Sequence, residues 1–230
     1  MFPFFFDPTF VLLIPAMILA FYAQSKVKST FTKYSRVTTA SGLTGAQVAR
    51  GILDAQGLTD VPVKKVQGQL TDHYHPRKRE LYLSEPVYDS NSVSAQGVAA
   101  HEAGHAIQHQ RGYTALKLRN AFVPVANFGS TLALPLFLIG FLFAGSITWL
   151  MDVGILLFTF AVLFHVITLP VELNASNRAI ALLQGQGYLQ GAEVTHARKV
   201  LNAAAWTYIA AATVAVMHLV RLLILRSARD

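Results

Sequence analysis

The chain has 230 residues, of which 53% are hydrophobic and 13% carry a formal charge. Soluble domains average about 25% charged residues, so the composition argues against a soluble enzyme and indicates a membrane protein. The absence of cysteine excludes disulfides and thiolate metal ligands. The net charge of +7 comes without a nucleic-acid-binding motif, and we attribute it to membrane topology and anionic lipid headgroups.

The first apolar segment runs from Phe10 to Tyr22 and is preceded by Asp7 and Pro8. No basic residue precedes it and no small-residue cleavage site follows it. We therefore expect an uncleaved membrane anchor rather than a removed signal peptide. Basic residues begin directly behind the anchor, at Lys26, so the positive-inside rule predicts that the next segment faces the cytoplasm.

The cytoplasmic segment, from Gln24 to Arg119, holds 13 Lys or Arg against 7 Asp or Glu. Its first predicted element is a helix over residues 44–57. Thr44 and Gln47 have the spacing of a capping box at its start, and Gly57 supplies a stop.

Two strands and a second helix are predicted next. Residues 61–68 and 79–85 have the pattern of short strands, and the polar stretch between them predicts a turn. After a Pro-containing loop, a helix is expected from about Val93 to Arg111. This segment is therefore a small α+β region.

The second helix carries His101, Glu102 and His105 in the pattern His-Glu-x-x-His. Two histidines four residues apart share one helical face, so both imidazoles can reach one tetrahedral zinc ion. The glutamate is placed to take a proton from a zinc-activated water. The alternative is a polar patch on an ordinary helix, which the small residues around the motif disfavour. His109 lies ~12 Å along the axis from His101 and ~80° around it, so we interpret it as a surface or supporting residue.

Residues 121–171 contain one formal charge, Asp152. At ~1.5 Å per residue they form roughly 76 Å of helix, enough to cross a ~30 Å hydrocarbon core twice. Gly145, Ser146 and Asp152 predict the turn between the two spans, and Trp149 suits a membrane interface.

Glu172 follows Pro170 at the end of this apolar run. On the predicted topology it lies on the same side of the membrane as the histidines. Two His and one Glu would leave an open fourth position, as in catalytic zinc sites. The alternative is a solvated carboxylate that stabilises the start of a helix.

The fourth and weakest span is Ala203 to Leu225, which contains His218 and Arg221. Four spans place the C-terminal arginines outside, in mild conflict with the positive-inside rule. His165 and His218 are ionisable groups in apolar surroundings. We expect each to be neutral and bonded to a neighbouring helix.

Four blocks of the chain are informative together: GQLTDHYHPRKRELYLSEPVY, VAAHEAGHAIQH, PVELNASNRAIALL and ARKVLNAAAWTYIAA. They resemble the YugP-type neutral zinc metallopeptidases of bacterial membranes, and the similarity covers roughly residues 44–212. The resemblance implies a zincin-like protease with His101, His105 and Glu172 as zinc ligands and Glu102 as the base.

The wider relatives, the HtpX-type membrane proteases, have the pattern E-x-x-A-D-x-x-A around their third ligand. Here Ser176 stands at the Asp position, which removes a carboxylate expected to orient a histidine ligand. Asn174 and Asn177 are candidates to replace it.

The implied reaction needs a donor for the developing oxyanion, and Arg178 is the first candidate. Four other residues are alternatives with a structural role as the competing interpretation: His73, Tyr74, His75 and His196. The strand at 81–84 resembles the edge strand that holds an extended substrate in such enzymes, the alternative being an ordinary paired strand.

We therefore expect a mainly α membrane protein with about four transmembrane helices and a small α+β zincin-like cytoplasmic domain. The expected function is a gluzincin-like zinc metalloendopeptidase of the cell (inner) membrane that cleaves membrane-associated polypeptides at the cytoplasmic face. A catalytically silent scaffold with a metal site is the alternative. A metal transporter using Asp152, His165 and His218 is disfavoured by their wide separation. The expected regions are an anchor (1–23), a catalytic region (24–119), two transmembrane helices (120–171), a cytoplasmic helical segment with the third ligand (172–202) and a last transmembrane helix with the tail (203–230).

Overall fold

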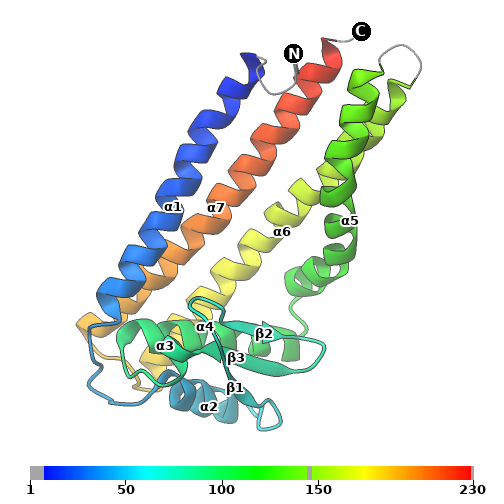
Figure 1. Cartoon of the computed structure of the whole chain (residues 1–230). Coiled ribbons are helices and arrows are strands. Elements are labelled where there is room, and N and C mark those ends of the chain that lie inside the picture. The colour runs from blue at the N-terminus through cyan, green and yellow to red at the C-terminus, as the bar shows by residue number, and fades with distance from the viewer. Residues whose placement is uncertain (1–7, 144–146, 229–230) are drawn as a thin grey trace. The chain divides into compact units, whose positions relative to one another are not determined.

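The computed structural model describes residues 8–143 and 147–228, which form two compact units (Figure 1). The helix unit comprises the described residues of 1–24, 117–170 and 207–230. The α+β unit comprises residues 25–116 and 171–206. The predicted turn residues Gly145 and Ser146 lie outside the described residues, as does Asp7.

The described part of the chain is mostly helical, and four of its helices are long and apolar enough to cross a membrane, the number predicted from the sequence. They are α1 (Leu13–Tyr34, preceded by the 3-10 helix η1, Pro8–Leu12), α5 (Thr114–Leu142), α6 (Trp149–Gly185) and α7 (Ala192–Ser227).

Two of these helices extend further than the apolar pattern predicted. Helix α6 continues through Pro170 to Gly185, so the alternative interpretation, in which Glu172 stabilises the start of a helix, is wrong. Helix α7 begins at Ala192, eleven residues before the predicted span. A proline inside a helix removes one N–H donor, which a long apolar helix tolerates when its neighbours cover the gap.

In the helix unit, α5 and α6 approach closely at glycines. A Cβ added at Gly154 would lie 2.6 Å from the Ala133 carbonyl oxygen, and one at Gly129 would lie 2.6 Å from that of Leu157. Contacts between small residues of this kind allow membrane helices to pack backbone against backbone. The buried cluster of this unit consists of Phe137, Phe141, Met151, Leu222 and Leu225.

The α+β unit contains the predicted helices and strands. Its elements are α2 (Gly45–Ala55), β1 (Val63–Val66), β2 (His73–His75), β3 (Glu80–Ser84), α3 (Glu85–Tyr88) and α4 (Val93–Gln110). The capping box of α2 is confirmed: the Gln47 N–H donates to Thr44 Oγ1 at 3.3 Å, and the Thr44 N–H donates to Gln47 Oε1 at 2.9 Å.

The sheet differs from the prediction in two respects. The predicted turn contains an additional strand, β2. The sequence did not predict it because three residues are too few to show an alternating pattern. The strand order is β1-β3-β2, with β1 parallel and β2 antiparallel to β3. The strand at 81–84 is therefore central and paired on both sides, so its interpretation as an edge strand is wrong.

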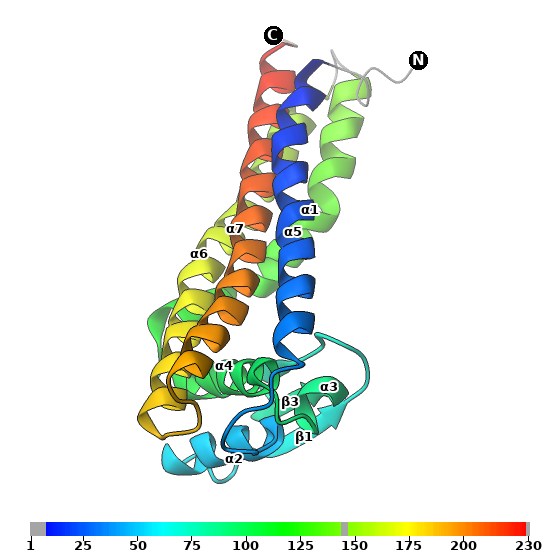
Figure 2. The ribbon, with the colours of Figure 1, turned by 90° about the vertical axis from the view of Figure 1, so that its left-hand side faces the viewer.

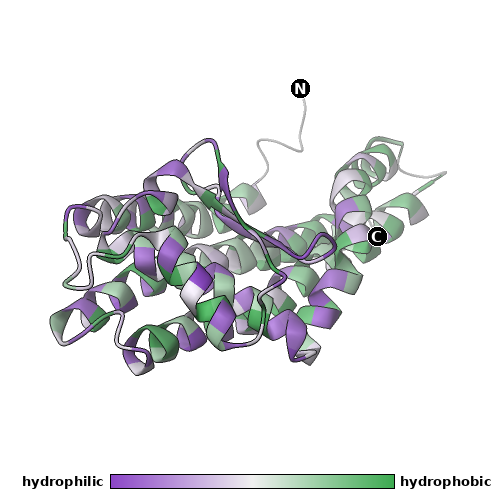
Figure 3. Ribbon diagram, turned by 90° about the horizontal axis from the view of Figure 1, so that it is seen from below, coloured by the Kyte–Doolittle hydropathy of each residue, from purple (hydrophilic) through white to green (hydrophobic). Residues whose placement is uncertain are grey.

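Helix α4 lies at the centre of the α+β unit, packed against α2 and beside the ends of α6 and α7 that belong to this unit (Figures 1 and 2). Hydrophilic and hydrophobic residues alternate along the elements of this unit in Figure 3. The apolar residues meet in one core, to which α4 contributes mostly alanines: Ala95, Ala99, Ala100, Ala103 and Ala106. Small side chains bring the neighbouring helices close to the residues that α4 carries.

Candidate metal centre

The His-Glu-x-x-His motif lies on a helix that is buried on almost every side. Ser92 caps the N-terminus of helix α4, and its Oγ accepts a hydrogen bond from the Ala95 N–H at 3.2 Å. His101, Glu102 and His105 are 9%, 8% and 8% exposed. Polar groups so deeply buried are costly unless they have partners, so their contacts are informative.

Gly104 lets α6 approach this face of α4. A Cβ at Gly104 would lie 3.0 Å from the Ala175 carbonyl oxygen and 3.4 Å from its Cα. The two backbones therefore nearly touch, three residues beyond Glu172 on α6. This contact explains the small residue inside the motif.

The two histidines and Glu172 converge on one point. His101 Nε2 lies 3.2 Å from Glu172 Oε2, and His105 Nε2 lies 3.5 Å from the same oxygen. The two imidazole rings are 4.8 Å apart and meet edge to face. One nitrogen or oxygen atom from each of the three residues lies within 4.8 Å of the others.

These donor atoms fit a zinc ion. Zinc bonds of about 2.0–2.1 Å at tetrahedral angles place neighbouring ligand atoms about 3.3–3.4 Å apart. The two measured separations, 3.2 and 3.5 Å, bracket that value. Two neutral imidazoles and a carboxylate are also the ligand types that a catalytic zinc site uses.

A chain of hydrogen bonds orients His105. The imidazole donates its Nδ1–H to Gln108 Oε1 at 3.0 Å, which leaves the Nε2 lone pair directed at Glu172. The Gln108 amide in turn donates to the Val171 carbonyl and to Asn174 Oδ1, both at 2.9 Å. Arg178 Nε donates to the same Asn174 oxygen at 2.7 Å. Such outer contacts fix the tautomer and direction of a metal ligand.

His101 has a single contact of this kind. Its Nδ1 lies 3.1 Å from Ser176 Oγ. The residue at the position of the missing aspartate therefore still bonds His101, through a hydroxyl. Of the two predicted replacements, Asn174 joins the His105 network instead, and Asn177 is exposed. Sequence reasoning missed Gln108, although its place three residues after His105 puts it on the same helical face.

Glu102 lies beside the convergent residues and is held by the sheet. Its Oε2 accepts a hydrogen bond from the Tyr74 N–H of strand β2 at 3.0 Å. Burial raises the pKa of the Glu102 carboxyl to about 7, and the carboxylates of Glu172 and Asp72 act in the same direction. His101 and the Tyr74 N–H oppose that rise. A carboxyl group with a pKa near neutrality can both accept and return a proton.

The other predicted residues occupy different places. His109 is not among the convergent residues; its Nδ1 lies 2.9 Å from the Tyr74 hydroxyl. His73 stacks on Tyr82, and His75 Nδ1 accepts from the Lys78 N–H at 3.2 Å.

His196 is also remote from the motif and stacks on Tyr34. The intramembrane candidates His165 and His218 belong to the helix unit, where each packs edge to face on a phenylalanine, Phe164 and Phe158 respectively.

The family described as "Putative neutral zinc metallopeptidase" matches residues 9–227. The chain belongs to this family. It is 52% identical over 220 residues to the "Putative membrane protease YugP" of Bacillus subtilis (strain 168), a match that covers 95% of this chain and 97% of that protein. No solved structure matches the chain. In this zinc metallopeptidase family member, the convergent His101, His105 and Glu172 are the group that could hold the ion the family name implies.

Proposed function

We propose that this protein is a membrane zinc metalloprotease of the His-Glu-x-x-His type. His101, His105 and Glu172 hold the zinc ion, and Glu102 is the general base. The proposal rests on one observation: Glu172 converges with both histidines, and the buried Glu102, which is not part of the converging group, lies next to them.

A bound zinc ion supplies a Lewis acid that acidifies water and polarises a peptide carbonyl. Glu102 accepts the proton of the attacking water and delivers it to the leaving amine. Arg178 remains the proposed oxyanion donor. Its Nε is bonded to Asn174, and its terminal guanidinium nitrogens hydrogen-bond to no residue in the described part of the chain.

The polypeptide substrate is proposed to extend strand β2 rather than β3. Only one side of β2 is paired within the described sheet, and its Tyr74 N–H points to Glu102. An added strand at that edge would place a peptide bond beside the general base.

We infer a multi-pass protein of the inner membrane whose α+β unit, residues 25–116 and 171–206, faces the cytoplasm. The basic residues behind the first span support this orientation. Arg226, which conflicts with it, donates from Nε to Asp152 Oδ1 at 2.7 Å. Glu172 directly follows an apolar segment in the sequence, and this position supports membrane-associated polypeptides as the substrates.

The decisive experiment compares zinc content and peptide hydrolysis in the purified full chain and two variants. We expect Glu102→Gln to keep stoichiometric zinc and lose hydrolysis by at least about a hundredfold, because a general base contributes 10²–10⁴-fold. Glu172→Ala should lose both zinc and hydrolysis, because only two protein ligands, the histidines, would remain where a catalytic zinc site has three.

Glu85→Ala is the matched control, since Glu85 is an exposed carboxylate in the same unit. It should change neither quantity. Undiminished zinc in Glu172→Ala would remove Glu172 from the site, and full hydrolysis by Glu102→Gln would refute its role as base.

A further inference from the structure

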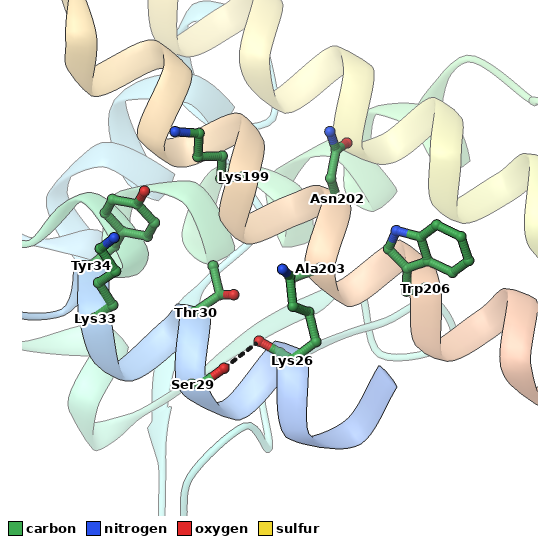
Figure 4. Close-up of a pocket in the computed structure, with 9 residues that line it drawn as sticks. All are labelled: Lys26, Ser29, Thr30, Lys33, Tyr34, Lys199, Asn202, Ala203 and Trp206. Carbon is green, nitrogen blue, oxygen red and sulfur yellow. Dashed lines mark hydrogen bonds between the residues drawn. The ribbon is translucent and has the colours of Figure 1, made fainter. Parts of the chain in front are cut away.

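A polar cavity lies in the α+β unit between α1 and α7 (Figure 4). Its volume is ≈ 520 Å³, which is large enough for a small headgroup. Lys26 and Lys33 come from α1 and Lys199 from α7, and Figure 4 shows Lys26 and Thr30 extending from α1 toward α7. No acidic side chain is among the described residues that line it.

The three lysines have no carboxylate partner anywhere in the part of the chain that the structure describes. Lys33 makes a cation–π contact instead, with its Nζ 5.4 Å from the centre of the Tyr34 ring. Lysines elsewhere in this unit do form ion pairs, as Lys64 does with Glu80 and Lys65 with Asp89. The cavity therefore concentrates positive charge that the protein itself leaves unneutralised.

Neutral hydrogen-bond donors complete the lining. Thr30 supplies a hydroxyl, Asn202 an amide and Trp206 an indole N–H. Ammonium groups together with hydroxyl and amide donors are a set that suits the several acceptor oxygens of a phosphate. The set does not suit a metal cation, because every charged group in the lining is positive and would repel the ion.

The surroundings favour a phosphate that belongs to a lipid. Both helices that line the cavity have the length and composition of membrane spans. Trp206 is 44% exposed at the rim, and tryptophan is enriched at the headgroup level of bilayers. A neighbouring groove shares Ser29 and Lys33 with the cavity and adds Lys28 and Arg36, so the positive surface continues along α1.

We propose that this cavity binds the phosphate of an anionic phospholipid from the cytoplasmic leaflet. The site is separate from the metal centre in its residues: none of its lining residues is a proposed ligand or base. The inference rests on the membrane placement of the proposed function and not on peptide hydrolysis. Bound lipid would fix α1 to α7 at this end of the α+β unit.

The test uses the full chain in nanodiscs and the fluorescence of Trp206. The chain has two tryptophans, so a Trp149→Phe background leaves Trp206 as the single reporter. Phosphatidylglycerol with brominated acyl chains is titrated into phosphatidylcholine discs, and brominated phosphatidylcholine serves as the lipid control. We expect saturable quenching at a mole fraction at least tenfold lower for the anionic lipid.

Two double variants of equal charge loss separate a site from a diffuse positive surface. Lys26→Gln with Lys199→Gln should abolish the preference for the anionic lipid, since each lysine contributes about fivefold. Lys28→Gln with Arg36→Gln, which leaves the cavity lining intact, should retain most of it. Equal loss in both pairs, or equal quenching by the two lipids in the parent protein, would overturn the proposal.

Soluble phosphate is tested in the same discs. Inorganic phosphate at millimolar concentration should leave the quenching unchanged at constant ionic strength. If it displaced the lipid, the site would belong to a soluble phosphate and the lipid proposal would be wrong. Zinc content is measured on every variant. An unchanged zinc content would show that the lipid proposal can be wrong while the proposed metal centre stands.

Discussion

Two of the close backbone contacts of helix α6 depend on a glycine in the same way but have different consequences. In the helix unit, Gly154 of α6 approaches the Ala133 carbonyl of α5, beside the apolar side chain of Phe137. In the α+β unit, Gly104 of α4 approaches the Ala175 carbonyl of α6, next to buried histidines and carboxylates. The first contact fills space, whereas the second sets the distance between the proposed metal ligands.

The difference shows what small residues contribute to a buried polar site. Ser176 has a short side chain and yet reaches His101 at 3.1 Å, because the two helix backbones are almost in contact. Gln108 likewise reaches the backbone of α6 at Val171. A wider spacing would leave these buried groups without partners, at a cost of about 1–3 kcal/mol each.

The largest expected effect comes from adding side chains at the two glycines. Gly104→Val forces α4 and α6 apart, so the proposed ligand atoms, now 3.2 and 3.5 Å apart, no longer converge on one point. We expect zinc affinity to fall by more than about a hundredfold, beyond the usual effect of losing one supporting contact. Zinc titration of the purified metal-free protein measures this fall.

Gly154→Val should instead lower thermal stability, by an overpacking cost of about 1–3 kcal/mol, while zinc per folded molecule stays constant. Gly97→Ala is the control on α4 itself, because the nearest atoms to its added Cβ are 3.8 and 4.0 Å away. If Gly104→Val and Gly154→Val lowered zinc affinity equally, the contact at Gly104 would have no special role in the proposed metal site.

The second prediction concerns Glu102, the carboxyl group that α4 buries beside the proposed metal ligands. In metal-free protein the pKa of Glu102 is about 7 when folded, against about 4.5 for an ordinary glutamate. The folded state therefore holds this proton more tightly, so its contribution to stability is present below pH 4.5 and is lost as the pH rises to 7. A difference of about 2.5 pKa units corresponds to about 3 kcal/mol.

Glu102→Gln removes this titration while keeping an oxygen for the Tyr74 N–H. Denaturant unfolding in detergent should show little difference between variant and parent at pH 4, and an advantage for the variant that grows up to pH 7. Glu85→Gln, at an exposed position, should show no such trend. A difference that does not change with pH would contradict the role of burial.

Much of the α+β unit was predictable because its signals are local. The capping box at Thr44 and the helical pattern of α4 depend on residues a few positions apart. Strand β2 was missed because three residues carry no readable alternation, and the pairing of β3 on both sides depends on that strand. Gln108 escaped notice because its three partners lie on two helices, and only their contact at Gly104 brings those partners together.

The smallest expected effects compare the supports of the two histidines. Gln108→Leu removes the acceptor of the His105 Nδ1–H and the link to Asn174, so we expect a 10–100-fold loss of zinc affinity. Ser176→Ala removes one contact to His101 and should cost tenfold or less. Gln110→Leu, at the exposed end of α4, is the matched control and should bind zinc as the parent does. A larger loss in Ser176→Ala than in Gln108→Leu would mean that the hydroxyl, rather than the amide network, fixes the geometry of the site.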